Sequence, residues 1–466
     1  MCSRSTAIAV LAVAFIVAGS DHSLPTGAHV ASAQTAQRPN ILIVVTDDQR
    51  AQGTLWVMPK TRRYFKREGV HFPNAFAVTP LCCPSRATIL TGRYAHNTGV
   101  RRNEPPLRLD LTTLFPRLLR QAGYRTAIVG KFLNSWNPAR RPPHFNRSAI
   151  GGGAYIDPTF NVDGTIRTFD GYQTTVIGRF ARRFLRGFEA HDAAPWLLYM
   201  APHAPHHPWV PAARYRSRPV GTWPGNPAVF ESDRTDKPAF VRSISRSLAD
   251  GRFIRRGQLR LLMSVDDEIG RLFATLRRLG EARTTLAIFT SDNGFLWADH
   301  RLGGDRQSSA GKRLPYTASV QIPFFVRWPG HVAAGSRDRR ITGTVDIAPT
   351  VLDAAGVAPD PAKPPLDGRS LVSGERRTRI VLEYWRGRGI PSWASLRTRR
   401  HQYVEYYTDR GRRFFREYYN LARDPWQLRN LLRDGNPANN PHVTALSRQL
   451  QHDRQCRGTT GARACP

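Results

Sequence analysis

The stretch from residue 81 to residue 93, Leu-Cys-Cys-Pro-Ser-Arg-Ala-Thr-Ile-Leu-Thr-Gly-Arg, places a candidate nucleophile and a fixed cation a few residues apart. Pro84 suits the first turn of a helix and Gly92 can end one, so Cys82 is expected at or just before a helix N-terminus. Free backbone N–H groups at such an end favour an anion, and Arg86, one turn in, can bind two oxygens of a tetrahedral group. The pattern predicts a sulfate or phosphate site.

Four apolar segments end in polar residues and are typical of buried parallel strands. They are residues 40–46 before Asp47-Asp48-Gln49, 125–129 before Gly130-Lys131, 196–200 before Ala201-Pro202-His203, and 285–290 before Ser291-Asp292-Asn293-Gly294. In open α/β sheets, ligands bind beyond the carboxyl ends of parallel strands. These polar ends are therefore expected to converge on one active site.

Asp47, Asp48, Asp292 and Asn293 offer only oxygen ligands. This donor set suits a hard divalent cation, and the use of several carboxylates favours Ca²⁺ over Mg²⁺. Any one of the four could instead cap the chain after a strand, but four such residues at two strand ends favour a metal site. Asp266-Asp267 lie in a helical segment, where a solvated helix face explains them better than metal binding.

Helical periodicity occurs between the strands, at residues 111–122, 174–188 and 259–279. Alternating strands and helices indicate an α/β fold with a large, mainly parallel sheet covered on both faces. Residues 138–170 and 204–258 are rich in Pro, Gly and Arg and are expected to form long loops over the active-site edge. His206 and His207 could touch substrate there, although loop histidines beside prolines are more often merely exposed.

The last third of the chain no longer alternates long strands and helices but contains short aromatic segments. It predicts a strand at 322–327 and a helix opened by Asp346, whose side chain can cap it. Short aromatic strands follow at 379–385, 394–397, 403–407 and 413–420, with a helical tail after them. We therefore expect a smaller antiparallel sheet with a helix, and a division into a catalytic domain at 34–372 and a C-terminal subdomain at 373–466.

The N-terminus is typical of a secretory signal, with Arg4, an apolar run at 7–18 and the tripeptide Ala31-Ser32-Ala33. Cleavage after Ala33 would remove residues 1–33, while Gly19-Ser20 offers an earlier site. No segment reaches the ~18 consecutive apolar residues of a membrane-spanning helix. A secreted protein, extracellular or in the cell envelope, is expected. A disulfide between Cys456 and Cys465 would suit export, although two free thiols also fit the sequence.

The formal net charge is +34, and only six of the 69 basic residues are lysine. Such a field attracts polyanions, both sulfated polysaccharide and nucleic acid. However, the arginines are spread along the whole chain, so a coding bias toward arginine explains the charge equally well. No specific nucleic-acid site is expected.

The run Cys-x-Pro-Ser-Arg followed by Leu-Thr-Gly-Arg closely resembles the signature of the sulfatase family. In that family the first cysteine is oxidised to formylglycine by a formylglycine-generating enzyme, and the resemblance assigns this modification to Cys82, not Cys83. Taken alone, Cys82 could also be a buried free cysteine, half of a strained disulfide with Cys83, or a thiolate activated by the helix end.

The resemblance covers nearly all of the chain after the signal. It includes Thr46-Asp47-Asp48, Gly130-Lys131, the Ala-Pro-His of 201–203, Ser-Asp-Asn-Gly at 291–294, Asp-Ile-Ala-Pro-Thr at 346–350, and Tyr-Asn-Leu at 419–421 with Asp424-Pro425. The segments 130–134 and 311–316 look most like N-acetylglucosamine-6-sulfatases and extracellular heparan endosulfatases. The family fold implied is that of the alkaline phosphatase superfamily with a smaller C-terminal sheet domain.

The resemblance also implies a mechanism of sulfate monoester hydrolysis. The formylglycine hydrate from Cys82 places one oxygen on the metal, for which the family analogy again favours calcium, and attacks sulfur with another. Arg86 orients this nucleophile, Lys131 and Lys312 neutralise the sulfate oxygens, and His203 or Lys312 assists departure of the alcohol. Many sulfatases have a histidine where this chain has Leu133, so the residue that releases sulfate is unassigned.

The expected substrate is a sulfated small molecule or glycan, with an O-sulfated glucosamine-type unit of an anionic glycan preferred. Trp297, beside a metal-binding strand end, could pack on a sugar ring or simply anchor a loop. Two other functions fit the same residues. One is a phosphonate or phosphodiester hydrolase on the same scaffold, and the other is a catalytically silent polyanion-binding protein in which Cys82 stays a thiol.

Overall fold

A computed structural model describes residues 38–191, 194–304 and 311–466. The predicted secretory signal at 1–33, with Arg4 and the Ala31–Ala33 tripeptide, lies outside the described residues. Among the residues that are described, no helix is long and apolar enough to cross a membrane.

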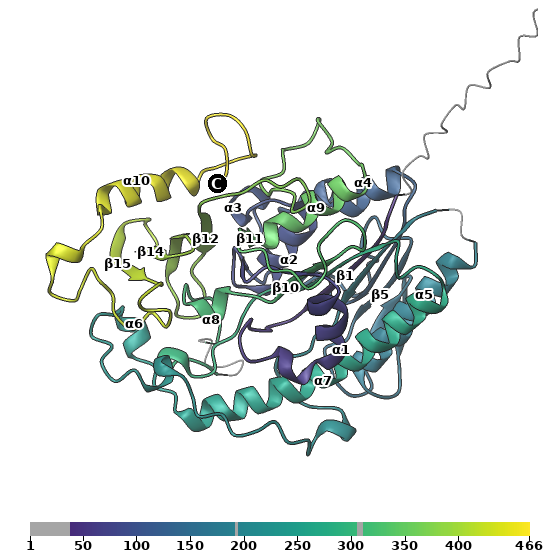
Figure 1. Ribbon diagram of the computed structural model, residues 1–466, viewed down its shortest axis with the longest axis horizontal. Helices are drawn as coiled ribbons and strands as arrows, with labels where there is room; N and C mark the ends of the chain where they lie inside the picture. Colours follow the sequence, from purple (N-terminus) through teal and green to yellow (C-terminus); the bar gives the residue numbers. More distant parts are fainter. Residues whose placement is uncertain (1–37, 192–193, 305–310) are drawn as a thin grey trace, which may run out of the picture. The chain divides into compact units, whose positions relative to one another are not determined.

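The core of the fold is a sheet of nine strands in the order β2-β10-β9-β1-β8-β4-β5-β6-β7 (Figure 1). The strands are β1 (Asn40–Thr46), β2 (Val70–His71), β4 (Arg125–Gly130), β5 (Arg147–Gly151), β6 (Thr159–Val162), β7 (Thr165–Thr168), β8 (Trp196–Ala201), β9 (Thr285–Ser291) and β10 (Phe324–Arg327). The five central strands, from β9 to β5, pair in parallel, and the others pair antiparallel. The prediction of a mainly parallel sheet is confirmed.

Both faces of this sheet are covered because successive side chains of the central strands, which point to opposite faces, are apolar. Ile41 and Ile43 of β1 pack in one cluster with α2 (Cys82–Thr91), α4 (Phe115–Gln121) and α9 (Ile347–Ala354). Leu42 and Val44 pack in a second cluster with α5 (Gln173–Glu189) and α7 (Leu248–Arg278). Figure 1 shows these two groups of helices on opposite sides of the sheet.

The prediction of two long loops, at residues 138–170 and 204–258, is partly wrong. Residues 138–170 contain β5, β6 and β7, which extend the main sheet. Residues 204–258 contain short turns and α6 (Ala239–Arg242), but α7 already begins at Leu248, where Ser247 and Asp250 form a capping box. Gly251 weakens the helical pattern in the sequence, yet packing requires it, since a Cβ there would lie 2.5 Å from the Trp297 carbonyl oxygen.

The prediction that Asp266-Asp267 lie on a solvated helix face is wrong. Both side chains bind α7 to α1 (Pro59–Thr61). The buried carboxylate of Asp266 accepts hydrogen bonds from the backbone N–H groups of Lys60 and Thr61, at 3.2 and 2.7 Å. Asp267 forms an ion pair with Lys60, with an Nζ–Oδ1 distance of 2.7 Å. The pair is therefore structural.

The C-terminal part forms the predicted antiparallel sheet, in the order β12-β13-β14-β15. Its strands are β12 (Ile380–Tyr384), β13 (Ser392–Arg397), β14 (His401–Tyr407) and β15 (Arg413–Asn420), followed by α10 (Val443–Asp453). The Cys456–Cys465 disulfide is present. Side chains of this sheet share one apolar cluster with Phe76, Leu81 and Tyr316 of the preceding part. The domain boundary after residue 372 stays a prediction.

Smaller elements complete the chain. A two-stranded parallel sheet joins β3 (Asn74–Phe76) to β11 (Ile341–Gly343), and α3 (Ala95–Thr98) and α8 (Thr317–Val320) are single turns. The predicted cap of α9 by the Asp346 side chain is wrong. That carboxylate turns back to accept the Gly343 N–H at 2.8 Å and to pair with Arg377 at 2.6 Å, since a buried guanidinium is the stronger partner.

Candidate active site

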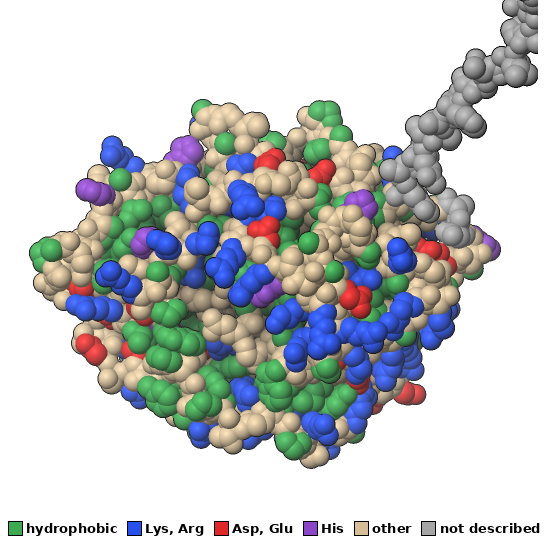
Figure 2. Space-filling model, viewed as in Figure 1, with side chains coloured by type: hydrophobic (Ala, Val, Ile, Leu, Met, Phe, Trp, Pro, Cys, Tyr) green, Lys and Arg blue, Asp and Glu red, His purple; other side chains and the backbone are tan. Residues whose placement is uncertain are grey.

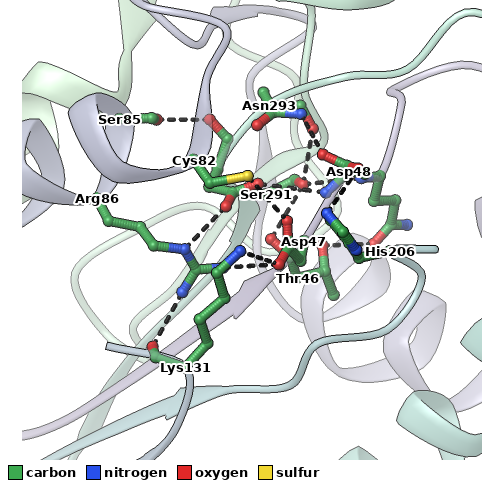
Figure 3. Close-up of polar contacts among 12 residues, drawn as sticks. Thr46, Asp47, Asp48, Cys82, Ser85, Arg86, Lys131, His206, Ser291 and Asn293 are labelled. Atoms are coloured by element: carbon green, nitrogen blue, oxygen red, sulfur yellow. Dashed lines mark hydrogen bonds and ion pairs between the residues drawn. The ribbon is translucent and has the colours of Figure 1, made fainter. Parts of the chain in front are cut away.

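The carboxyl ends of β1 and β9 lie together, as the sequence predicts, and carry the acidic residues of the site (Figure 3). Asp292 donates its backbone N–H to the Thr46 carbonyl oxygen at 3.0 Å, and Asp48 donates its own to Asp292 Oδ1 at 3.2 Å. Asp48 adopts a left-handed backbone conformation, φ 68°, which turns the chain sharply after the strand. All three carboxylates, of Asp47, Asp48 and Asp292, are buried.

Cys82 is the first residue of α2, so the predicted position at a helix N-terminus is confirmed. Its Sγ lies 3.4 Å from Asp47 Oδ1 and 2.9 Å from Lys312 Nζ. Neither Cys82 nor Cys83 is in a disulfide. Burial, followed by the charge of Asp47, raises the pKa of the Cys82 thiol to about 12, so a thiolate nucleophile is not favoured at neutral pH.

Arg86 joins the first turn of α2 to two strand ends. Its Nε donates to Asp292 Oδ2 at 2.8 Å, and one terminal nitrogen donates to the Lys131 carbonyl oxygen at 3.0 Å. Its other terminal nitrogen, Nη2, is buried and has no hydrogen-bond partner in the described part of the chain. Ser85 adds a hydrogen bond from Oγ to the Asp292 carbonyl oxygen. The guanidinium is thus fixed, with one donor group left for a ligand.

The two lysines predicted for the site each contact one carboxylate. Lys131 Nζ lies 2.5 Å from Asp47 Oδ2, and Lys312 Nζ lies 2.6 Å from Asp48 Oδ1. Burial alone would raise the pKa of Asp47, but Lys131, His206, Arg86 and Lys312 together hold it well below the usual value. Burial opposes the charge of Lys312, yet Asp48 and its neighbours raise the pKa above the ordinary lysine value. The Lys131–Asp47 contact therefore joins two charged groups, since, although burial opposes it, the neighbouring charge of Asp47 also raises the pKa of Lys131.

The acidic cluster fits a divalent cation. Ligand atoms of Asp47, Asp48, Cys82 and Asp292 all lie within 4.8 Å of one another. Asn293 donates its amide to Asp48 Oδ1 at 2.6 Å, whereas its Oδ1 is buried without a partner among the residues that the structure describes. Burial and the charge of Asp47 raise the pKa of Asp292 to about 6, which is the cost of placing carboxylates side by side. A hard cation would relieve that repulsion and use the amide oxygen.

His203 is a predicted site residue that lies near Lys131 without a hydrogen bond to the other predicted site residues among those described. Its Nδ1 is buried and has no hydrogen-bond partner in the described residues. Burial and the neighbouring Lys131 lower the pKa of His203 to about 3, so the ring is neutral in the structure.

His206 was left out of the predicted site residues, and of the two alternatives open for it, contact with the site or mere exposure, the structure favours the first. Its Nε2 lies 3.7 Å from Asp48 Oδ2, and its side chain is 24% exposed. Together with Asp47 and Cys82 it could hold a metal ion (Figure 3). A sequence signal existed, because the tripeptide Ala-Pro-His occurs twice in succession, at 201–203 and 204–206.

Trp297 is a loop anchor. The side chain is buried, its Nε1 donates to Gln258 Oε1 at 2.6 Å, and the Arg50 guanidinium lies 4.5 Å above the ring. Because the ring is buried, its N–H is bonded and one of its faces lies against Arg50, Trp297 does not pack on a sugar.

The C-terminal sheet holds the segment that carries Lys312, with one contact from each of three strands. Trp393 of β13 donates Nε1–H to the Arg313 carbonyl oxygen at 2.8 Å. Gln402 of β14 donates to the Pro315 carbonyl oxygen at 2.7 Å. Glu417 of β15 accepts the Tyr316 hydroxyl at 3.0 Å. The position of Lys312 beside Cys82 therefore depends on the C-terminal sheet.

An open α/β sheet, a helix N-terminus with a fixed arginine and an oxygen-rich acidic cluster are the features of a protein class that can hold a tetrahedral anion beside a metal. The chain belongs to the sulfatase family. The sequence model of that family, Sulfatase, matches residues 39–357, and a second one, N-sulphoglucosamine sulphohydrolase, C-terminal, matches residues 308–456.

Several curated proteins are similar to this chain. The putative extracellular sulfatase Sulf-1 homolog of Caenorhabditis elegans is 32% identical over 375 residues, which cover 74% of this chain and 51% of that protein. The N-acetylglucosamine-6-O-sulfatase of Bacteroides thetaiotaomicron is 28% identical over 482 residues, covering 85% and 83%. The chain thus spans about half of the nematode relative, and 34% of the extracellular sulfatase SULF-1 homolog of Drosophila melanogaster.

Solved structures agree with the fold. BT4656 in complex with its substrate D-glucosamine-2-N,6-O-disulfate superimposes with a TM-score of 0.77 and 25% identity, covering 89% of this chain and 97% of that one. The phosphonate monoester hydrolase SpPMH of Silicibacter pomeroyi gives a TM-score of 0.65 at 24% identity, over 89% and 94%. Because both proteins share the fold, the fold alone does not choose between sulfate and phosphonate.

Proposed function

We propose that this protein hydrolyses sulfate monoesters on a sugar, through a formylglycine made from Cys82 and a divalent cation, Ca²⁺, held by Asp47, Asp48, Asp292 and Asn293. One observation carries the proposal: Cys82 starts a helix with its Sγ 3.4 Å from a carboxylate of the cation cluster and 2.9 Å from Lys312 Nζ. When present, the cation would supply positive charge to oxygen ligands, and the formylglycine would supply a hydrated aldehyde as nucleophile.

The side chains of this protein would bind the sulfate and direct it. Arg86, held by Asp292 and the Lys131 carbonyl, keeps a buried donor nitrogen for an oxygen near residue 82. Lys131 and Lys312 would neutralise charge on the sulfate oxygens as the ester bond breaks. Between the two candidates for protonating the alcohol, Lys312 is favoured, because it contacts Cys82 Sγ, whereas His203 has a pKa of about 3.

The proposal also covers the substrate, the export of the protein and its maturation. The substrate is an O-sulfated glucosamine-type unit of an anionic glycan, a choice supported by the similarity to N-acetylglucosamine-6-O-sulfatase and to the structure that binds D-glucosamine-2-N,6-O-disulfate. Export is supported by the Cys456–Cys465 disulfide and by the similarity to extracellular sulfatases. A formylglycine-generating enzyme would act on Cys82 during maturation.

The substrate proposal predicts a salt-dependent preference. We expect an O-sulfated glucosamine oligosaccharide to be turned over faster than a small aryl sulfate, with the preference falling about tenfold between ~50 and ~200 mM salt if roughly two charge contacts are screened. Steady-state kinetics on both substrates across a salt series would measure it. Equal rates at every salt concentration would show that the enzyme is a small-molecule arylsulfatase.

The same assay separates the sulfatase from the phosphonate or phosphodiester hydrolase. A matched aryl phosphodiester with the same leaving group is the control substrate. Turnover of the phosphodiester above that of the aryl sulfate would contradict the proposed reaction.

The contacts of the C-terminal sheet with the Lys312 segment lead to a second prediction. Trp393→Phe removes the donor to the Arg313 carbonyl, and we expect a loss of about tenfold in kcat, equivalent to about 1.4 kcal/mol, from a less well placed Lys312. The measurement is kcat on an aryl sulfate together with the thermal midpoint.

Trp328→Phe is the matched control, because the Trp328 ring is also buried and stacks on His331 after β10. It should lower the thermal midpoint without a comparable effect on kcat. Equal losses of kcat in the two variants would mean that Trp393 contributes only to stability.

A further inference from the structure

We propose that the exposed face of α5, with the adjoining edge strand β7, is a second binding site for a sulfated or carboxylated polysaccharide chain, separate from the active site. At its centre is a groove of about 180 Å³ whose lining includes Arg147, Arg167 and Arg183 above Phe169 and Phe180. We call this surface the α5 groove. The inference extends the proposed function, because it assigns a place where a long substrate is held away from the reacting sulfate.

The helix contributes a row of positive charge. Arg179, Arg183 and Arg186 recur at intervals of four and three residues, so they share one face of α5, over about 10 Å, and all three are exposed. Like charges at these intervals repel. Arg183 and Arg186 have no side-chain partner within the described residues, and Arg179 donates only to the Asp170 carbonyl oxygen, at 3.2 Å. Figure 2 shows Lys and Arg side chains gathered in the region of α5 and α7.

This arrangement is not general for α5. Arg182, on the neighbouring face of the helix, forms an ion pair with the buried carboxylate of Glu268, which also pairs with Arg271. The arginine that packs against α7 is thus neutralised, whereas no ion pair of the outward row is found among the described residues.

The strands contribute the other wall of the groove. β7 is the last strand of the sheet and all four of its residues are exposed, including Arg167, which has no side-chain partner in the part of the chain described. Arg147 of β5 is bonded through Nε to Asp163 at 2.7 Å, and its guanidinium lies 4.8 Å from the Phe184 ring. Asp163 thus neutralises part of the charge on this wall of the groove, because it pairs with Arg147 and, at 3.8 Å, with Arg141.

The chemistry of the α5 groove favours a sulfated or carboxylated polymer. A guanidinium binds two oxygens of a sulfate or carboxylate at once, and several in a row require an anion with repeated charges. Single-stranded nucleic acid is bound instead through exposed rings on which bases stack. Phe180 is only 6% exposed and Phe169 is partly buried against it, so the rings that line the groove form its apolar floor. Such a floor suits the C–H face of a sugar.

The test compares two triple variants of the full-length protein that lose the same charge. Arg167→Gln/Arg183→Gln/Arg186→Gln alters the α5 groove, and Arg399→Gln/Arg400→Gln/Arg410→Gln alters exposed arginines of the C-terminal hairpins. Binding of dextran sulfate is measured by fluorescence anisotropy over a salt series. We expect the groove variant to bind at least tenfold more weakly at ~150 mM salt and to lose about two to three from the slope of log Kobs against log salt. The control variant should change less than about twofold.

The assay also gives results that would overturn the inference. Equal weakening in both variants would mean that the whole positive surface acts, and an unchanged groove variant would exclude the site. Duplex DNA is the competing probe, and an equal loss for DNA in the groove variant would make the surface a general polyanion site. Because binding is read without turnover, and both variants should hydrolyse a small aryl sulfate like the unaltered protein, failure of the groove and failure of the proposed reaction are distinguishable.

Discussion

Replacement of Cys82 by alanine should abolish sulfate ester hydrolysis, with a loss on the order of 10⁶-fold in kcat, as the removal of other enzyme nucleophiles produces. The reason is that Cys82 Sγ lies 3.4 Å from Asp47 Oδ1 and 2.9 Å from Lys312 Nζ, the position proposed for the nucleophile. Turnover of an aryl sulfate is the measurement. Mass analysis of the peptide that contains Cys82 should show formylglycine in the unaltered protein.

Cys83→Ala is the matched control. Cys83 is also buried, but its Sγ contacts the Asn134 carbonyl oxygen at 3.6 Å, and it is not part of the acidic cluster that includes Cys82. We expect it to cost about 1 kcal/mol of stability through a small cavity and to keep most of the activity. The reverse pattern would place the modified residue one position later, and a fully active protein with an unmodified Cys82 thiol would refute the mechanism.

Asp292→Ala should remove both the bound cation and the activity. The carboxylate is a proposed ligand and also the partner of the buried Arg86 guanidinium, with an Nε–Oδ2 distance of 2.8 Å. Breaking a buried pair by removing one partner costs about 3–5 kcal/mol. The variant should therefore show less than one cation per protein by elemental analysis, a lower thermal midpoint and no measurable turnover.

Two further variants separate these effects. Asp292→Asn keeps the shape of the side chain while removing its charge, and it should lose the cation with a smaller loss of stability. Asp266→Asn removes a buried carboxylate of α7 that lies outside the site and should keep the cation and the activity. Full metal occupancy in Asp292→Ala would rule out its assignment as a ligand, and a purely kinetic defect would indicate a role in orienting substrate.

The sequence was sufficient to predict the central strands and to bring together the residues at their carboxyl ends. Continuous apolar segments such as Asn40–Thr46 are stable only when both faces are covered, so their hydrophobicity alone predicts buried parallel strands. Polar residues directly after such strands must lie at one edge of the sheet. This is why Asp47, Asp292 and Lys131 could be placed together before the structure was known. The helix start at Cys82 follows from Pro84 and Gly92 in the same local way.

The tertiary structure alone decided features whose local signal is weak or misleading. β5, β6 and β7 form in a Gly- and Arg-rich segment because β5 pairs with β4, β6 with β5 and β7 with β6, which satisfies their backbone groups. Asp266 appears solvated by periodicity but is buried, because Lys60 and Thr61 offer it N–H donors. His206 appears to be an ordinary loop histidine, yet the chain brings it to Asp48. For Asp266 and His206 the partner lies far away in the sequence, and burial of a polar group is favourable only where such a partner is supplied by the folded chain.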